Sequence, residues 1–399
     1  MQRLKPILAP LLWPTICLIV GLSIQHAAGW QLPWALVLIV LVGATLFFWR
    51  WPKVQSVLIG FCFVALGLWL MQHSEQRALQ RAVQRAECER VEPTALDRLK
   101  ERALQWREGL LEHYRQVAEN DEQYAVLAAM TLGDKSALTK ELRNTYSVAG
   151  ASHILALSGL HLGIIYMLLS MLTLGRRRQW LAQIIVVLGI WAFALLTGLS
   201  VSVVRSASMI SLYAVFSLGG RRRSPLNLLC FTAMLMLVIN PMTLYDVGFQ
   251  LSFLSVAAIL LFMPLFDLFK PKVVGRYPLL NWLWGLMAVS TAAQLGVTPL
   301  IAYYFGRFST YFLLTNLIVV PAATLILYGA LVVMVVPAVG TLLARVVQCL
   351  NNILNWLSQL PGASIEGLSP SVLQTALCYV LVLLFYFLLR KLGTGRLRV

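Results

Sequence analysis

The chain has 399 residues, of which 59% are hydrophobic and only 12% are charged, and it carries a formal net charge of +16. Apolar runs of about 17 or more residues recur through most of the sequence, and each is long enough to cross a hydrocarbon layer about 30 Å thick. This composition excludes the two or three soluble domains that the length alone would suggest. It predicts an all-α, polytopic helical membrane protein.

About twelve membrane segments are expected. Three of them form an N-terminal membrane region at 1–71, and the others form a second one at 149–390, before a basic tail at 391–399. Prolines in the last third indicate kinked or re-entrant helices at Pro299, Pro321 and Pro337, which are tolerated where they are buried or face water. The segments are expected near 7–24, 33–49, 54–71, 149–173, 180–197, 200–218, 224–240, 248–268, 281–303, 311–336, 340–357 and 372–389.

Charge placement predicts how these segments are oriented. The range 71–146 holds 12 of the 32 basic and 13 of the 16 acidic residues, which leaves 20 basic and three acidic residues for the rest of the chain. With the N-terminus in the cytoplasm, alternation of the segments also puts the arginine clusters at 176–178 and 221–223 there, as the positive-inside rule requires. Both termini are therefore expected in the cytoplasm, and the polar segment 72–148 outside it.

This polar segment has a helix-forming composition. Residues 75–114 are rich in Ala, Leu, Arg, Glu and Gln, and their apolar residues recur at helical spacing. Residues 125–148 predict a short helix, a turn at Gly133 and Asp134, and a second short helix. We expect extracytoplasmic amphipathic helices that lie over the membrane surface, the last part forming a plug or collar over the mouth of a cavity. The alternative is a solvated linker with one amphipathic helix.

The stretch 150–163 places three polar side chains in an otherwise apolar run. They belong to His153, Ser158 and His161. On a helix that advances about 100° per residue, these three lie within an arc of roughly 140°. Gly159 and Gly163 form a GxxxG pair on about the opposite side, where a neighbouring helix can approach closely. The pattern is typical of a helix that packs on one side and lines a polar cavity on the other.

Polar side chains also occur in or beside other apolar segments. Arg205 lies about five residues inside its segment, so it either snorkels to the outer interface or joins a wet face with neighbouring serines. Asp246 is either the N-cap of the next helix or an ion partner of Arg205. Each remaining group would by itself make an interhelical hydrogen bond, but together they indicate a shared hydrophilic route. These groups are Gln250, Gln294, Arg307 and Asn316.

Residue arrangements that carry catalysis are few. Ser158 and His161 resemble a nucleophile and its base, but no acidic residue nearby orients the histidine and no GxSxG motif occurs. The six cysteines show no CxxC or Cys/His metal spacing, and no GxxxxGK[ST] phosphate loop is present. We therefore expect no metal, no cofactor and no enzymatic activity. Intramembrane hydrolysis by Ser158 and His161 is the alternative.

The run from His153 to Gly163 (HILALSGLHLG) closely resembles the signature of the ComEC-type competence proteins, the DNA-uptake channels of the bacterial inner membrane. The resemblance covers about residues 95–390. It continues in order through LGDK at 132–135, LTGLS at 196–200, Arg205, GGRRRSPLN at 219–227, Asn240 and Pro241, GFQLSF at 248–253, AQLG at 293–296, YFGRFS at 304–309 and NLIVVP at 316–321.

The resemblance implies a channel domain at 149–390 that admits single-stranded DNA to the cytoplasm during natural transformation, with the lipid bilayer around it. Relatives also carry an extracytoplasmic OB-fold and a C-terminal metallo-β-lactamase-like domain. This sequence leaves about 25 residues for the first and nine after Arg390 for the second, without an HxHxDH motif. A separate DNA receptor, nuclease and cytoplasmic motor are therefore expected. The alternative is a membrane permease for another, anionic solute.

Overall fold

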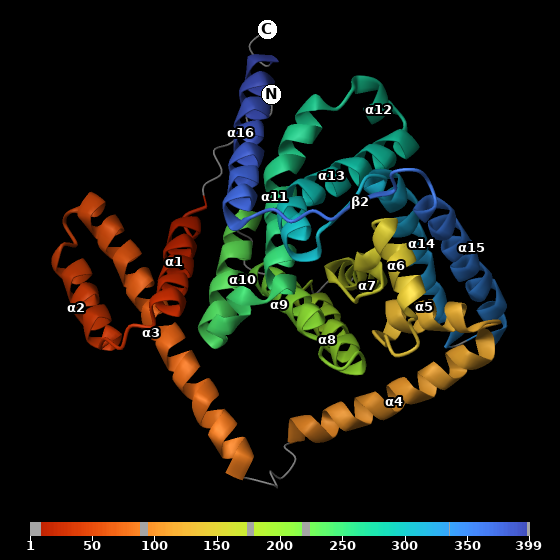
Figure 1. Cartoon of the computed structure of the whole chain (residues 1–399), viewed down its shortest axis with the longest axis horizontal. Coiled ribbons are helices and arrows are strands. Elements are labelled where there is room, and N and C mark those ends of the chain that lie inside the picture. The colour runs from red at the N-terminus through yellow and green to blue at the C-terminus, as the bar shows by residue number, and fades with distance from the viewer. Residues whose placement is uncertain (1–8, 88–94, 174–178, 218–223, 335, 397–399) are drawn as a thin grey trace. The chain divides into compact units, whose positions relative to one another are not determined.

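The structure, a computed structural model, is almost entirely helical. In the ranges that it describes it contains sixteen α-helices and one two-stranded sheet (Figure 1). The expected all-α fold class is confirmed. The arginine clusters at 176–178 and 221–223 and the end of the basic tail lie outside the described residues. The described ranges are 9–87, 95–173, 179–217, 224–334 and 336–396.

In the described part of the chain, eleven helices are apolar and fall on the expected membrane segments. Five are long enough to cross a membrane: Pro52–Arg77, Val247–Phe269, Pro278–Phe305, Phe312–Val333 and Val372–Gly393. Six are shorter: Leu12–Ala28, Trp34–Phe47, Gly159–Leu172, Trp180–Leu196, Val201–Phe216 and Pro225–Ile239. The structure is therefore that of a polytopic membrane protein.

The chain divides into two compact units, of which the first comprises 1–93 and 219–253. In this unit α1 and α3 cross backbone to backbone, because Gly21 and Gly67 leave no side chain between them. A Cβ atom built on Gly21 would lie 2.1 Å from the Val64 carbonyl oxygen. Small residues at such crossings allow close helix packing in membranes. The elements of this unit are α1 (Leu12–Ala28), α2 (Trp34–Phe47), α3 (Pro52–Glu87), α10 (Pro225–Ile239), η2 (Pro241–Tyr245) and the start of α11 (Val247–Phe269).

The second unit comprises 94–218 and 254–399 and contains the signature stretch. It begins with α4 (Ala95–Val117), α5 (Asp121–Leu132), α6 (Lys140–Val148), η1 (Ser152–Ile154), α7 (Gly159–Leu172), α8 (Gln179–Leu196) and α9 (Val201–Ser217). After the remainder of α11 it continues with α12 (Lys272–Arg276), α13 (Pro278–Phe305), β1 (Arg307–Ser309), α14 (Phe312–Val333), η3 (Pro337–Val339), α15 (Gly340–Ser358), β2 (Ser364–Glu366) and α16 (Val372–Arg396).

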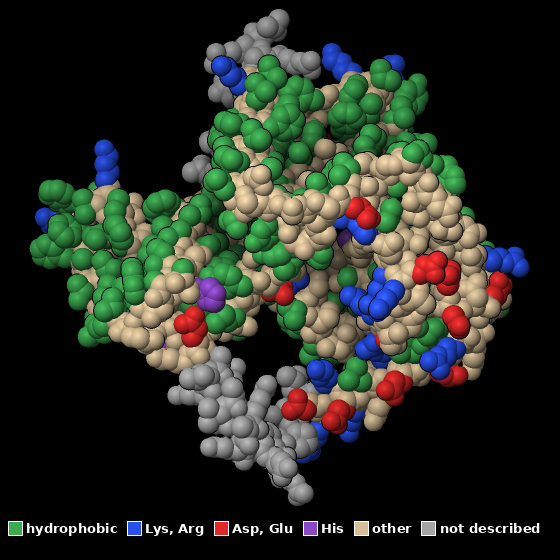
Figure 2. Space-filling view, viewed as in Figure 1, with side chains coloured by type: hydrophobic (Ala, Val, Ile, Leu, Met, Phe, Trp, Pro, Cys, Tyr) green, Lys and Arg blue, Asp and Glu red, His purple; other side chains and the backbone are tan. Residues whose placement is uncertain are grey.

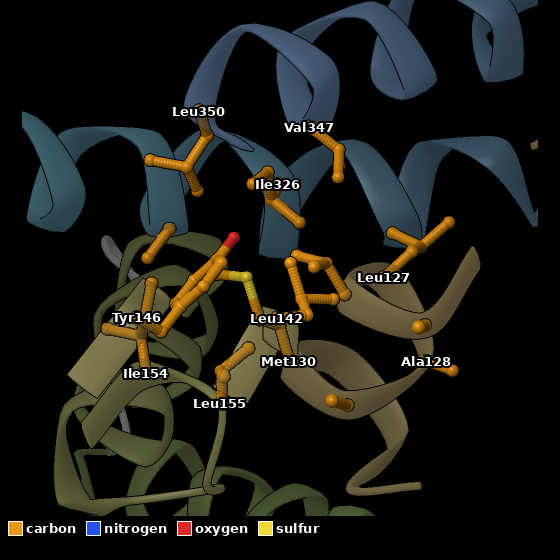
Figure 3. Packing of buried hydrophobic residues seen from close by; sticks show 14 of the residues in the cluster. Leu127, Ala128, Met130, Leu142, Tyr146, Ile154, Leu155, Ile326, Val347 and Leu350 are labelled. Carbon is orange, nitrogen blue, oxygen red and sulfur yellow. The ribbon is translucent and has the colours of Figure 1, made fainter. Parts of the chain in front are cut away.

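The main core of the second unit lies between α5, α6, α14 and α15. Ten of the twelve residues of α5 are buried, and Figure 3 shows Leu127 and Met130 of this helix facing Ile326 of α14. The helix ends at Gly133, whose φ of +72° is strained for other residues. The predicted succession of short helix, turn at Gly133 and second short helix is confirmed. α5 is thus part of the core of the unit, whereas the sequence predicted a plug or collar over the mouth of a cavity.

The polar helix α15 packs against the same core through one face only. Its other face bonds to the start of α5: Asn120 Nδ2 and Gln123 Nε2 each donate to Gln348 Oε1 at 3.0 Å. A Cβ atom on Gly340, at the start of α15, would lie 2.6 Å from the side chain of Val117, the last residue of α4. Val117 and Gly340 are therefore in direct contact. α15 is not among the eleven apolar helices, so the structure does not support a membrane crossing at 340–357, whereas the location of 72–148 outside the cytoplasm stays a prediction.

Two helices and a small sheet differ from the sequence-based expectation in the last third. Pro299 and Pro321 lie inside α13 and α14, and both helices are continuous through them. The break falls instead at Gly306 (φ +63°), after which β1 pairs antiparallel with β2. Strands of three residues carry too little alternation to be read from a sequence.

Candidate functional site

The signature stretch 150–163 is not one continuous helix. Gly150 (φ +84°) ends the connection from α6, His153 lies in the short 3₁₀ helix η1, and α7 begins only at Gly159. The expectation that His153, Ser158 and His161 share one helix is wrong. The reason is local: Ser158 has an extended backbone (φ −131°, ψ 176°) and is the N-cap of α7, a position that serine favours.

Ser158 and His161 form a reciprocal cap at this helix start. The backbone N–H of Ser158 donates to Nδ1 of His161 at 3.3 Å, and the Ser158 hydroxyl lies 3.2 Å from the same nitrogen. Because Nδ1 accepts a backbone N–H, the neutral imidazole carries its proton on Nε2. Among the described residues this buried Nε2 has no hydrogen-bond partner. Since buried donors are nearly always satisfied, a water or a visiting polar group fits this position.

The two histidines differ in environment. His161 is fully buried, whereas His153 is exposed. They are nevertheless near enough to interact electrostatically.

The two glycines of the GxxxG pair differ in how closely another helix approaches them. A Cβ atom on Gly159 would lie 3.2 Å from Ser206 Oγ of α9, whereas one on Gly163 would meet nothing within 4 Å. Arg205, the neighbour of Ser206, is only 3% exposed. The approach of α7 to α9 therefore depends on Gly159.

Leucine at these two positions should separate the roles of the glycines. Gly159→Leu is expected to destabilise the protein by about 1–3 kcal/mol, because the added atoms overlap Ser206. Gly163→Leu, the matched control, should change stability by less than about 0.5 kcal/mol at an open position. Thermal unfolding of the detergent-extracted protein measures both. Equal melting temperatures for the two variants would contradict this packing.

Several segments far apart in the sequence meet around the signature stretch. Two of the meetings involve a glycine: a Cβ atom on Gly133 would lie 2.6 Å from Leu157, and one on Gly150 would lie 2.7 Å from Ser309 Oγ. The hydroxyl of Tyr328 in α14 donates to the Ile164 carbonyl of α7 at 3.1 Å. The tertiary structure thus assembles the LGDK, HILALSGLHLG and YFGRFS blocks into one neighbourhood.

A second junction connects LGDK to LTGLS through α4. The Arg107 guanidinium lies 3.6 Å from the Asp134 carboxylate, and both side chains are mostly buried. The same guanidinium reaches within 3.9 Å of the Cβ position of Gly198. Leu199 follows with φ +55°, a conformation that is costly for a branched residue. Arg107 was not among the candidate residues, and only its helical spacing in a charged segment could have pointed to it.

β1 and the beginning of α14 carry unsatisfied polar atoms. In the described part of the structure, Ser309 Oγ, Thr315 Oγ1 and Asn316 Oδ1 are buried without a hydrogen-bond partner. Buried water commonly satisfies such groups when the site is polar and large enough. His161 Nε2 of α7 is a further buried atom of this kind.

Other candidate residues lie elsewhere and make local bonds. Asp246 Oδ1 accepts the backbone N–H of Phe249 at 2.7 Å, which confirms its alternative role as the N-cap of α11. Gln250 Nε2 donates to the Leu244 carbonyl at 2.9 Å. Both residues belong to the first unit, and these bonds stabilise the corner at which α11 begins.

Arg307 and Gln294 occupy two further places in the second unit. The Arg307 guanidinium pairs with Glu366 across the β1–β2 sheet at 2.9 Å and donates to Asn144 Oδ1 at 3.0 Å. Gln294 lines a mostly apolar cavity of about 750 Å³ between α13 and α16, near Phe308. Arg307 therefore belongs to the β1–β2 corner, and Gln294 belongs to the cavity between α13 and α16.

A further hydrogen bond in the core joins two residues that the sequence did not indicate as candidates. The Tyr146 hydroxyl donates to Asn351 Oδ1 at 2.6 Å, joining α6 to α15. Burial raises the pKa of the Tyr146 phenol, so it stays a neutral donor at physiological pH.

In the part of the chain that the structure describes, no three His, Cys, Asp or Glu side chains come together as a metal site would need.

Comparison with known proteins gives a family for this arrangement. The model of the Competence protein family matches residues 130–392. ComE operon protein 3 of Bacillus subtilis is 34% identical over 208 residues, which are 51% of this chain and 25% of the relative. Recombination protein 2 of Haemophilus influenzae is 25% identical over 228 residues, 54% of this chain and 29% of the relative.

A third relative is shorter than these two. An uncharacterized protein of Aquifex aeolicus is 30% identical over 200 residues, 50% of this chain and 45% of the relative. The chain thus spans between a quarter and a half of the length of the curated relatives it matches. No solved structure matches it.

Proposed function

This chain belongs to the Competence protein family, and from that premise we propose that it is a channel that passes single-stranded DNA into the cytoplasm during natural transformation. It is a multi-pass protein of the inner membrane. One observation carries the proposal. Signature blocks far apart in the sequence meet around 150–163, and buried polar atoms of His161, Ser309 and Thr315 are left without partners among the described residues.

The physical demands of DNA passage agree with such a polar interior. A strand that crosses hydrocarbon needs water or fixed polar groups along its whole path, because unsatisfied polar groups are costly in lipid. Hydroxyl, amide and imidazole groups offer hydrogen bonds to bases and sugars without holding the phosphates too tightly. The unpartnered atoms at the start of α14 and at His161 Nε2 supply groups of this kind.

The remaining parts of the proposal follow from this role. The channel works without catalysis of its own and without a cofactor, with both termini in the cytoplasm. A separate receptor delivers the DNA, a nuclease removes the other strand and a cytoplasmic motor draws the strand inward.

The contact of 3.2 Å between Ser158 and His161 is the observation that favours a hydrolase as the second candidate. The imidazole nitrogen nearest the hydroxyl, however, already accepts the backbone N–H of Ser158. A base engaged in capping a helix is a poor acceptor for the proton of a nucleophile. Labelling of the wild-type protein by a serine-reactive probe, lost in Ser158→Ala, would support hydrolysis instead of the channel.

Uptake of labelled DNA by a deletion strain tests the channel. Deletion of the gene should leave DNA binding at the cell surface intact but abolish the appearance of labelled strand in the cytoplasm. A plasmid-borne copy of the wild-type gene, as the control, should restore it. Undiminished cytoplasmic uptake in the deletion strain would rule out the proposed function.

A further inference from the structure

The turn between α5 and α6 exposes a group of basic side chains. Lys135, Lys140 and Arg143 all point into solvent within nine residues of sequence, and we refer to them as the α5–α6 basic surface. Figure 2 shows Lys and Arg side chains, with Asp and Glu side chains among them, over the part of the molecule where α5 and α6 lie. Three exposed positive charges close together in sequence suit a negatively charged partner.

This surface is held in a defined shape by local hydrogen bonds. Asp134 Oδ1 accepts the backbone N–H of Ser136 at 3.0 Å, and Thr139 caps α6 by accepting the N–H of Leu142 at 3.1 Å. Arg143 Nη2 donates to the Lys135 carbonyl at 2.8 Å. The guanidinium is thus positioned before any ligand arrives, which lowers the entropy lost on binding.

Ion pairs neutralise most of the acidic groups around this surface. Asp134 is paired with Arg107, and Glu366 is paired with Arg307 beside Asn144 of α6. Glu141 is the acidic residue between the three basic ones. The surface therefore keeps a positive charge toward solvent.

The absence of exposed apolar side chains distinguishes this surface from a membrane anchor. Among the described residues between Trp106 and Met167, no large hydrophobic side chain is exposed. Helices that bind the lipid interface insert Trp, Phe or Leu side chains next to their basic residues. α4 has this feature, with Leu99 and Trp106 exposed, whereas the α5–α6 turn is polar throughout.

We propose that the α5–α6 basic surface binds the phosphate backbone of the incoming DNA strand before the strand enters the interior of the unit. This inference rests on the proposed function and assigns one step of it to three residues. The chain runs directly from α6 through Gly150 into the signature stretch, so the basic surface immediately precedes this stretch in sequence. The affinity at such a surface comes from counterion release and falls with salt.

The test measures binding of a fluorescent single-stranded oligonucleotide to the full-length protein in nanodiscs at several salt concentrations. The variant Lys135→Gln/Lys140→Gln/Arg143→Gln should weaken binding, and the slope of log affinity against log salt should fall by about two, since each lost phosphate contact contributes roughly 0.7. The matched control is Arg98→Gln/Lys100→Gln/Arg102→Gln, which removes three exposed basic groups from α4. This control should leave the slope unchanged.

Each alternative outcome has a definite meaning. An unchanged slope in the first variant overturns the inference, and the proposed function survives if the deletion strain still fails to take up DNA. Oligonucleotide binding that the triple variant leaves unchanged, together with retention of anionic lipid that the variant loses, would assign the surface to lipid headgroups and overturn the inference as well. If the triple variant fails to fold, Lys140→Gln alone should lower the slope by about 0.7, and an unchanged slope there rejects the inference.

Discussion

Replacing Gly21 with leucine is expected to remove most of the folded protein from the membrane. A Cβ atom at this position would lie 2.1 Å from the carbonyl oxygen of Val64, and one at Gly67 would lie 2.5 Å from that of Leu18. Because the clash is with backbone and not with a flexible side chain, α1 and α3 have to separate. Overpacking costs about 1–3 kcal/mol even where side chains can move, against a total stability of about 5–15 kcal/mol.

A glycine in an open position of the same unit provides the control. A Cβ atom on Gly43 in α2 would meet nothing within 4 Å, so Gly43→Leu should accumulate like the wild type. The amount of protein in the membrane fraction and its melting temperature after extraction measure the difference. Gly67→Leu should reproduce the defect from the other helix. Equal yields of Gly21→Leu and Gly43→Leu would mean that α1 and α3 do not cross in this way.

Arg205→Gln is expected to lower the amount of folded protein severely. The Arg205 side chain is 3% exposed within the second unit, and a buried guanidinium persists only where its surroundings satisfy it. Glutamine does not reproduce the size, charge or donor geometry of the guanidinium, so the buried groups that enclose it are left unsatisfied, at about 1–3 kcal/mol for each group. The effect should therefore appear as loss of protein and not as slower passage through an intact channel.

An exposed arginine in a helix of the same unit is the control that separates a structural role of Arg205 from contact with the strand. Arg345→Gln, on the exposed face of α15, should leave protein levels unchanged. Protein in the membrane fraction and DNA uptake per molecule are measured together for both variants. Normal protein levels with reduced uptake per molecule in Arg205→Gln would contradict the structural role and place Arg205 in contact with the strand.

The membrane segments were predictable because they depend on local sequence. A run of apolar residues long enough to cross hydrocarbon forms a helix wherever it occurs, since the backbone has no other way to satisfy its polar groups in lipid. The turn at Gly133 and the cap at Asp246 were equally accessible, because each requires one residue type within a few positions of a helix end. Ser158 was misread because histidine stands where a capping box usually has Glu or Gln.

The uses of the other polar residues were not predictable from spacing. Arg307 was a candidate for the DNA path, but its partners are Glu366, on the neighbouring strand, and Asn144, 163 positions earlier in the chain. α15 was expected to cross the membrane, but its polar face bonds to Asn120 and Gln123. Partners at such distances in sequence leave no local pattern.

By itself, the sequence determined that this is a polytopic helical membrane protein of the competence type and where most of its apolar helices lie. These properties depend on hydrophobicity, turn residues and ordered blocks, all of which can be read along the chain. Only the tertiary structure decided that His161 is buried and His153 exposed, and that Gly159 packs while Gly163 does not. Burial is a property of neighbours in space, and the helices that bury His161 are supplied by segments far away in the sequence.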